Sequence, residues 1–246
     1  MIKLKSYAAK TETGPYLQVN EDDIDIDLMN HLYVVYDGFG GSNIGDKCVS
    51  ISKENIKKFY TKISSDPDST LPFYFSPKFL IEGNALINAV NLAHREILKL
   101  NASTEMSERG GVCLLAAAQS ENILTFVSTG NCMGLLFRKN KLSFITLPDS
   151  LADFSQDDYN QEFYSSPMSG LGLFDDIHLN TKELKILNDD IILLLTDGAY
   201  SRIKIKEIKY ILDKNDLSFS DKIVEIFNLV NSRGNLDNQS AILLKF

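Results

Sequence analysis

The amino-acid sequence predicts an α+β fold in which helices pack on antiparallel β-sheets. Candidate strands outnumber candidate helices, and they cluster in the middle of the chain. Two long segments carry apolar residues at helical spacing, which suits helices that cover the face of a sheet. No internal repeat, linker or low-complexity segment divides the 246 residues. We therefore expect one domain that spans residues 1–246.

The first hundred residues predict strands followed by two helices. We expect strands over residues 2–9, 24–28 and 32–36, a turn over 11–14, helices over 42–64 and 79–100, and a proline-containing loop over 66–77. The strands alternate apolar and polar residues or are continuously apolar, whereas the helices repeat apolar residues every three or four positions. His94 lies beside the apolar stripe of the second helix. We expect it to be a surface or boundary histidine rather than a ligand.

The middle and the end of the chain predict more sheet and two further helices. We expect strands over residues 112–118, 123–129, 133–137 and 142–147, a surface loop over 148–172, a hairpin of 184–187 with 191–196, helices over 204–212 and 218–232, and a final strand. The four central strands recur about every ten residues, which is typical of antiparallel meanders.

Composition excludes several functional classes. The net charge is −8, and no basic cluster stands out, which argues against nucleic acid as the main partner. No apolar run approaches the length of about 18 residues that spans a membrane. The three cysteines form no C-x-x-C pair, so we expect neither a disulfide framework nor a thiolate zinc site. The start of the chain lacks a secretory pattern, so we expect a cytoplasmic protein, although signal-independent export remains open.

Two apolar strands run directly into an Asp-Gly pair. Residues 32–41 read LYVVYDGFGG, and residues 191–198 read IILLLTDG. Asp-Gly is usually only a turn, and its commonest form is a tight hairpin that needs a second strand at once. Both copies are instead followed by helix-like patterns. A strand, an acidic turn and a helix, occurring twice, indicate a site.

Four aspartates share a setting beside predicted strands: Asp22, Asp37, Asp197 and Asp237. Glu21, Asp23 and Asn238 flank two of them. Mg²⁺ and Mn²⁺ prefer carboxylate and carbonyl oxygens, and two such ions can lower the pKa of a shared water and hold a phosphoryl group. The spacing alone does not show that the four aspartates converge, and an acidic loop can equally be a solvated surface.

The order of motifs resembles a known family. NED, DGFGG, a central GN turn, LLLTDG and a terminal DN follow one another as in the metal-dependent type 2C (PPM) Ser/Thr protein phosphatases, in their bacterial single-domain form. The resemblance covers nearly the whole chain. It implies a central sandwich of two antiparallel sheets flanked by pairs of helices, with two Mn²⁺ or Mg²⁺ ions at one end.

The resemblance also implies an activity and partners. A metal-activated water would hydrolyse phosphoserine or phosphothreonine in a phosphoprotein substrate without a phospho-enzyme. The protein would act as a monomer in a pathway that contains a Ser/Thr kinase. The loop over residues 149–170 lies near a variable flap of the family, and we expect it to shape substrate choice.

By position, the resemblance assigns roles to single residues. Asp37 corresponds to the aspartate that bridges both metals, and Gly38 to the glycine whose carbonyl oxygen binds one of them. Asp197 and Asp237 correspond to ligands of the other ion. Asp22, with Glu21 beside it, corresponds to the acidic pair of the first motif. The expected metal ligands are therefore Asp22, Asp37, Gly38, Asp197 and Asp237, and Asp37 and Asp22 are the expected catalytic residues.

Three positions depart from the family pattern. Leu17 stands where an arginine usually grips the substrate phosphate, Asn131 replaces an aspartate associated with a third metal, and Phe39 replaces the histidine of eukaryotic-type members. Candidate replacements for the arginine are Lys10, Lys47 and Arg109. These departures keep open the alternative of a pseudophosphatase that binds a phosphoprotein or kinase without turnover. A third alternative is a plain structural or calcium-binding domain.

Overall fold

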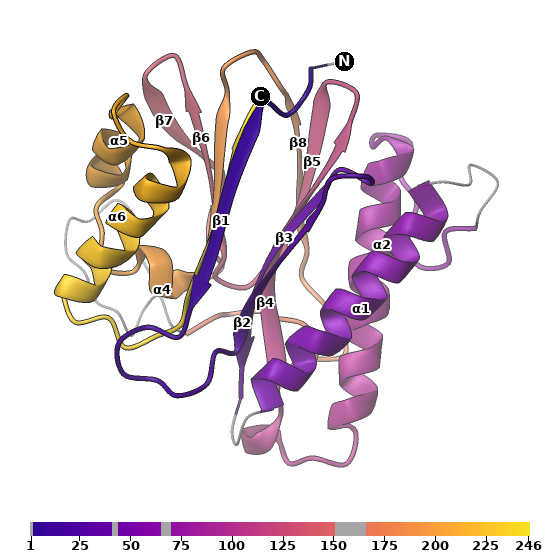
Figure 1. The fold of residues 1–246 in the computed structure, drawn as a ribbon. Coiled ribbons are helices and arrows are strands. Elements are labelled where there is room, and N and C mark those ends of the chain that lie inside the picture. Colours follow the sequence, from indigo (N-terminus) through magenta and orange to yellow (C-terminus); the bar gives the residue numbers. More distant parts are fainter. Residues whose placement is uncertain (1, 41–43, 65–69, 151–165) are drawn as a thin grey trace.

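The computed structural model describes residues 2–40, 44–64, 70–150 and 166–246. Two antiparallel five-stranded sheets stack face to face, and helices cover the outer face of each (Figure 1). The first sheet contains, in spatial order, β2 (Asp22–Asp27), β3 (Leu32–Phe39), β4 (Gly111–Ser120), β5 (Ile123–Thr129) and β8 (Asn180–Lys185). The second contains β1 (Ser6–Glu12), β10 (Gln239–Lys245), β9 (Ile191–Leu195), β6 (Met133–Arg138) and β7 (Lys141–Thr146). The predicted α+β sandwich is confirmed.

The helices divide between the two sheets. α1 (Ile44–Ser64) and α2 (Ile81–Asn101) pack on the first sheet, and the single 3₁₀ turn η1 (Met106–Glu108) follows them. The short α4 (Asp197–Tyr200), α5 (Ile205–Asp213) and α6 (Phe219–Ser232) cover the second sheet. Among the described residues, no helix is long and apolar enough to cross a membrane.

The alternation of side chains along β3 positions the functional site. Val34 and Tyr36 belong to the core beneath α1 and α2, whereas Tyr33 and Val35 belong to the core between the sheets. Because successive side chains of a strand point to opposite faces, Asp37 has the same orientation as Tyr33 and Val35. Its carboxylate is therefore directed toward the space between the sheets. The sequence predicted a strand that ends at residue 36, just before this aspartate. β3 instead continues to Phe39, so Asp37 lies within the strand.

The predicted hairpin of residues 184–187 with 191–196 is wrong. β8 pairs with β5 in the first sheet, whereas β9 pairs with β6 and β10 in the second. The chain between them crosses from one sheet to the other. Every residue of β9 is buried because this strand is central and covered on both faces, whereas β8 is an edge strand. Short sequence separation predicts pairing only when both strands belong to the same sheet.

Two smaller expectations also fail. β1 begins at Ser6 and includes the first two residues of the predicted turn, because Thr11 and Glu12 still pair with β10; the observed turn lies at residues 14–16. His94 is buried and not at the surface: the backbone N–H of Gly172 donates to its Nδ1 at 3.1 Å, and its Nε2 lies 3.3 Å from the carbonyl oxygen of Asp175. It holds the chain that follows the predicted flap. Most of that flap, residues 151–165, lies outside the described residues.

Candidate metal centre

The four predicted aspartates converge at one end of the sandwich. Asp22 in β2 is paired directly opposite Asp37 in β3, Asp197 begins α4 just after β9, and Asp237 directly precedes Asn238 and β10. Asp22, Asp37 and Asp197 are buried, and Asp237 is half-buried. Asp37, Asp197 and Asp237 line a cavity of about 200 Å³. Its described lining comprises Glu21, Asp37, Gly38, Phe39, Gly40, Cys113, Asn131, Pro167, Asp197 and Asp237.

The electrostatics of this cavity are those of a cation site. Burial raises the pKa of Asp37 well above its usual range, and the neighbouring Asp197, Asp22 and Asp237 raise it further. Burial and then Asp237 and Asp22 do the same for Asp197. No lysine or arginine is among the described lining residues. The carboxylates therefore repel one another without a compensating charge from the protein.

The carboxylates surround the cavity without closing on a single point. Within the described part of the chain, no group of three or more Asp, Glu, His or Cys side chains is arranged to hold one metal ion. Mg²⁺ and Mn²⁺ use few protein ligands and retain several waters, so carboxylates spread around a cavity match them better than a closed cage. The donor set, which consists of carboxylate and backbone oxygens, fits such ions.

Asp22 and Glu21 differ in their surroundings. Asp22 is not among the cavity lining, and its Oδ2 accepts a hydrogen bond from Thr196 Oγ1 at 2.8 Å. Thr196 is itself fixed by the backbone N–H of Ser240, at 2.9 Å. Glu21 lines the cavity, and the N–H of Gly45 donates to its Oε1 at 3.1 Å. The role of each acid as a ligand stays a prediction.

Glycine is required at two of the motif positions by close backbone contacts. A Cβ at Gly38 would lie 2.6 Å from the carbonyl oxygen of Glu21, to which the Gly38 N–H donates at 3.1 Å. A Cβ at Gly198 would lie 1.8 Å from the carbonyl oxygen of Asn238. These contacts bring together, at one end of the sandwich, the acidic segments of β3 and α4 and the segment that directly precedes β10.

Sequence reasoning missed the residues that fasten the acidic segments. Asn238 Oδ1 accepts from the N–H of Glu21 at 2.9 Å, and its Nδ2 donates to the carbonyl oxygens of Thr13 and Val19. Asn238 therefore ties the segment before β2 to the segment before β10. Thr196 performs the same function for Asp22. The only sequence signals were their positions beside the motif aspartates.

The residues that depart from the family pattern lie as follows. Asn131 lines the cavity, and its Nδ2 donates to Asp197 Oδ2 at 2.9 Å. Leu17 is 43 % exposed and does not line the cavity. The candidate replacements are also outside the lining: Lys10 pairs with Glu12, Lys47 is exposed on α1, and Arg109 Nε donates to the Thr104 carbonyl. None of the three is among the described lining residues.

Comparisons with known proteins identify the fold. No family model matches the sequence, and no curated protein matches it. Solved structures match over the full length. PppA, a regulatory component of the type VI secretion system of Pseudomonas aeruginosa, is 20 % identical with a TM-score of 0.79, and 98 % of each chain is covered. The PPM Ser/Thr phosphatase MsPP of Mycobacterium smegmatis, in complex with cacodylate, is 19 % identical with a TM-score of 0.78 and full coverage of both chains.

A third structure adds a metal-bound example. The catalytic domain of the Ser/Thr phosphatase PstP, in complex with two manganese ions, is 20 % identical with a TM-score of 0.76, over 98 % of this chain and 97 % of that one. The chain therefore has the fold of the PPM-type Ser/Thr phosphatases. At this level of identity the similarity shows the fold alone.

Proposed function

We propose that this protein is a Mn²⁺- or Mg²⁺-dependent phosphatase that hydrolyses phosphoserine and phosphothreonine in proteins. The observation that carries the proposal is the convergence of Asp37, Asp197 and Asp237 around one cavity, with Asp22 paired opposite Asp37, and the described lining of this cavity contains no cationic side chain. The fold of the PPM phosphatases supports it, as does the presence of two manganese ions in PstP. MsPP holds cacodylate, a tetrahedral oxyanion that resembles phosphate in shape.

The residues that would hold two divalent ions are the carboxylates of the cavity and one backbone oxygen. Asp37 would serve both ions, and two observations support this role: Asp22 lies opposite it in β2, and the charge of Asp197 raises its pKa. Gly38 would contribute its carbonyl oxygen, and Asp237 would complete the second ion's ligands. When bound, the ions would lower the pKa of a coordinated water and hold the phosphoryl group.

The chain's own residues support direct hydrolysis by water. Cys113 is the one thiol among the described lining residues, and burial followed by the charge of Asp37 raises its pKa well above the usual range. A thiol that stays protonated is a poor nucleophile. Phe39 fills one side of the cavity, where its ring packs against Gly111 and Gly170. The protonated thiol of Cys113 therefore does not compete with water as a nucleophile.

A second candidate function is a pseudophosphatase that binds a phosphoprotein or kinase without turnover. Two observations favour it. The Asn131 side-chain amide donates a hydrogen bond to the Asp197 carboxylate, and the described cavity lining holds no lysine or arginine that could bind a phosphate. Loss of a bidentate phosphate contact would lower the rate by about a hundredfold or more.

The deciding experiment is hydrolysis of a phosphothreonine peptide with Mn²⁺, with Mg²⁺ and with EDTA. Asp37→Asn is the test variant. Asp25→Asn is the matched control, because Asp25 is also a buried aspartate of the same sheet but pairs with Lys57 at 3.6 Å, outside the cavity. Turnover that needs metal and is lost only in Asp37→Asn supports the phosphatase. Mn²⁺ binding in calorimetry without turnover supports the pseudophosphatase. The absence of both Mn²⁺ binding and turnover would refute both candidate functions.

A further inference from the structure

A second and larger cavity lies near the amino-terminal segment that leads into β1. It has a volume of about 580 Å³ and is lined by Lys3, Leu4, Lys5, Ser6, Tyr7, Leu28, His31, Tyr33 and Gln119. None of these residues lines the acidic cavity. Tyr33 lies four residues before Asp37 on β3, which corresponds to about 13 Å of strand. The volume falls within the range of about 300–1,000 Å³ that is typical of small-molecule sites.

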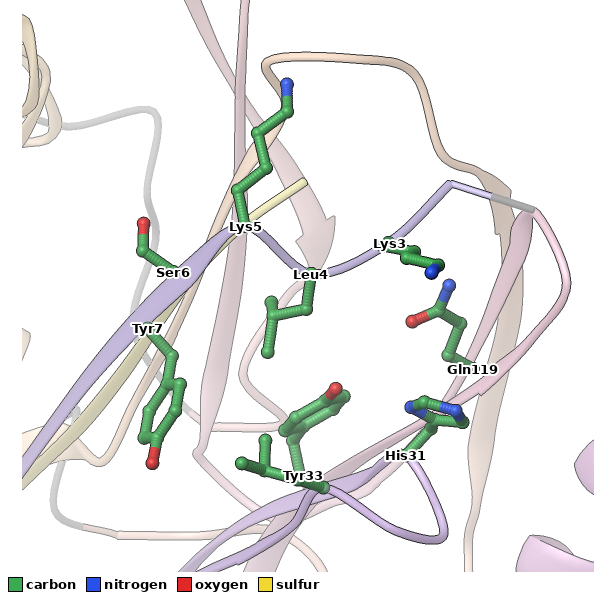
Figure 2. A pocket seen from close by; sticks show the side chains of 9 residues that line it. Lys3, Leu4, Lys5, Ser6, Tyr7, His31, Tyr33 and Gln119 are labelled. Atoms are coloured by element: carbon green, nitrogen blue, oxygen red, sulfur yellow. The ribbon is translucent and has the colours of Figure 1, made fainter.

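Two buried polar atoms at this cavity have no hydrogen-bond partner in the described structure: the hydroxyl of Tyr33 and Oε1 of Gln119. Tyr33 is fully buried and Gln119 is 4 % exposed. Buried polar groups almost always have a partner, because a missing one leaves the cost of desolvation uncompensated. Figure 2 shows both atoms directed toward the space below Leu4 and beside His31.

The chemistry of the two atoms is fixed by their surroundings. Gln119 Nε2 donates to the carbonyl oxygens of Ile2 and Glu121, both at 2.8 Å, so its Oε1 is left as an acceptor toward the cavity. Burial raises the pKa of Tyr33 to about 12, so its hydroxyl stays protonated and can donate. A ligand that satisfies both atoms needs a donor for Gln119 Oε1, and an acceptor on the same ligand can take a hydrogen bond from the Tyr33 hydroxyl.

The remaining lining favours a negatively charged ligand with an apolar body. Lys3 and Lys5 contribute positive charge, and no acidic residue is among the described residues of the lining. Lys5 is paired at 3.1 Å with the exposed Asp189, whereas Lys3 forms no ion pair with another described residue. Leu4, Leu28 and the rings of the two tyrosines form the apolar surface.

We propose that this cavity binds a small aromatic carboxylate that also carries an N–H or O–H donor. The ring would pack on Leu4 and Tyr33, the donor would bond Gln119 Oε1, and the carboxylate would accept from the Tyr33 hydroxyl. The proposal is independent of the activity at the acidic cavity, because it rests on different residues and its test measures binding alone.

The test is an NMR titration of the ¹⁵N-labelled chain with three probes. Indole-3-acetate has a ring, an N–H donor and a carboxylate, naphthalene-1-acetate lacks the donor, and indole-3-ethanol lacks the carboxylate. We expect saturable shifts at residues 2–7, 28–33 and 119 with indole-3-acetate, and affinity that is about 3- to 10-fold weaker for each of the other two. No saturable shift up to about 10 mM, shifts elsewhere, or equal affinities for all three would overturn the proposal.

Tyr33→Phe and Tyr36→Phe form a matched pair. Both hydroxyls are buried on β3 without a hydrogen-bond partner among the residues that the structure describes, but Tyr36 faces the helices and does not line the cavity. Tyr33→Phe should leave the melting temperature unchanged or raised, because it removes an unsatisfied group, and should weaken indole-3-acetate about 3- to 10-fold. Tyr36→Phe should leave the affinity unchanged. Equal affinity in both variants would mean that the Tyr33 hydroxyl contacts no ligand, and would refute the assignment.

Discussion

Asp37→Asn should have opposite effects on stability with and without metal. In the metal-free protein, Asp37 faces Asp22 across the β2–β3 pair, where opposite Cβ atoms are about 5 Å apart. Two unit charges at that separation repel by about 3 kcal/mol at an effective dielectric constant of about 20. Partial protonation relieves most of this repulsion, so we expect the neutral amide to stabilise the metal-free protein by about 1–2 kcal/mol.

With metal, the order should reverse. A ligand at one hundred times its dissociation constant stabilises a folded protein by about 2.7 kcal/mol. For a chain of 246 residues the entropy of unfolding is about 0.5 kcal/mol/K, so wild type should gain about 5 °C in melting temperature with saturating Mn²⁺. Asp37→Asn should start about 2–4 °C above metal-free wild type and gain little from Mn²⁺.

The assay is thermal unfolding followed by circular dichroism, with EDTA and with Mn²⁺. Asp25→Asn serves again as the control and should retain the full Mn²⁺ shift, because Asp25 pairs with Lys57 and not with the cavity acids. If Asp37→Asn retains a Mn²⁺ shift equal to that of wild type, the acidic cavity is not where the metal binds, and our reasoning about the site is wrong.

Three further predictions concern single positions. Gly198→Ala should destabilise the protein by about 3 kcal/mol in thermal unfolding, because the new Cβ would lie 1.8 Å from the Asn238 carbonyl oxygen; an unchanged melting temperature would contradict the model of this contact. Asn131→Asp adds a carboxylate to the cavity, so it should lower the metal-free melting temperature and tighten Mn²⁺ binding in calorimetry, and weaker binding would count against the site. Hydrogen bonds from Arg233 lower the pKa of Glu207 to about 2, so this pair should stabilise the fold above about pH 4.5 and lose that effect as the pH falls through 2. Because both side chains are about one-third exposed, Glu207→Gln should cost only about 1–2 kcal/mol at pH 7 and nothing near pH 2 in urea unfolding; a cost that does not change with pH would exclude the ion pair as its source.

The sequence by itself determined the local elements and the chemistry of the acidic motifs. Helical spacing predicted α1, α2 and α6 to within a few residues of their observed bounds, because an amphipathic helix records its buried face in its own sequence. The two apolar stretches that run into Asp-Gly predicted Asp37 and Asp197 as residues of a site, and both line the acidic cavity. Their glycines were identified for the same reason, since only glycine permits such close backbone approach.

Only the tertiary structure decided which segments meet. β8 and β9 are neighbours in sequence but belong to different sheets, because strand pairing depends on partners elsewhere in the chain. The buried contacts of His94, the fastening by Asn238 and the placing of Glu21 in the cavity lining depend in the same way on segments distant in sequence. The unsatisfied atoms of Tyr33 and Gln119 are also beyond sequence reasoning, because a missing partner is a property of the packed structure and of no residue pattern.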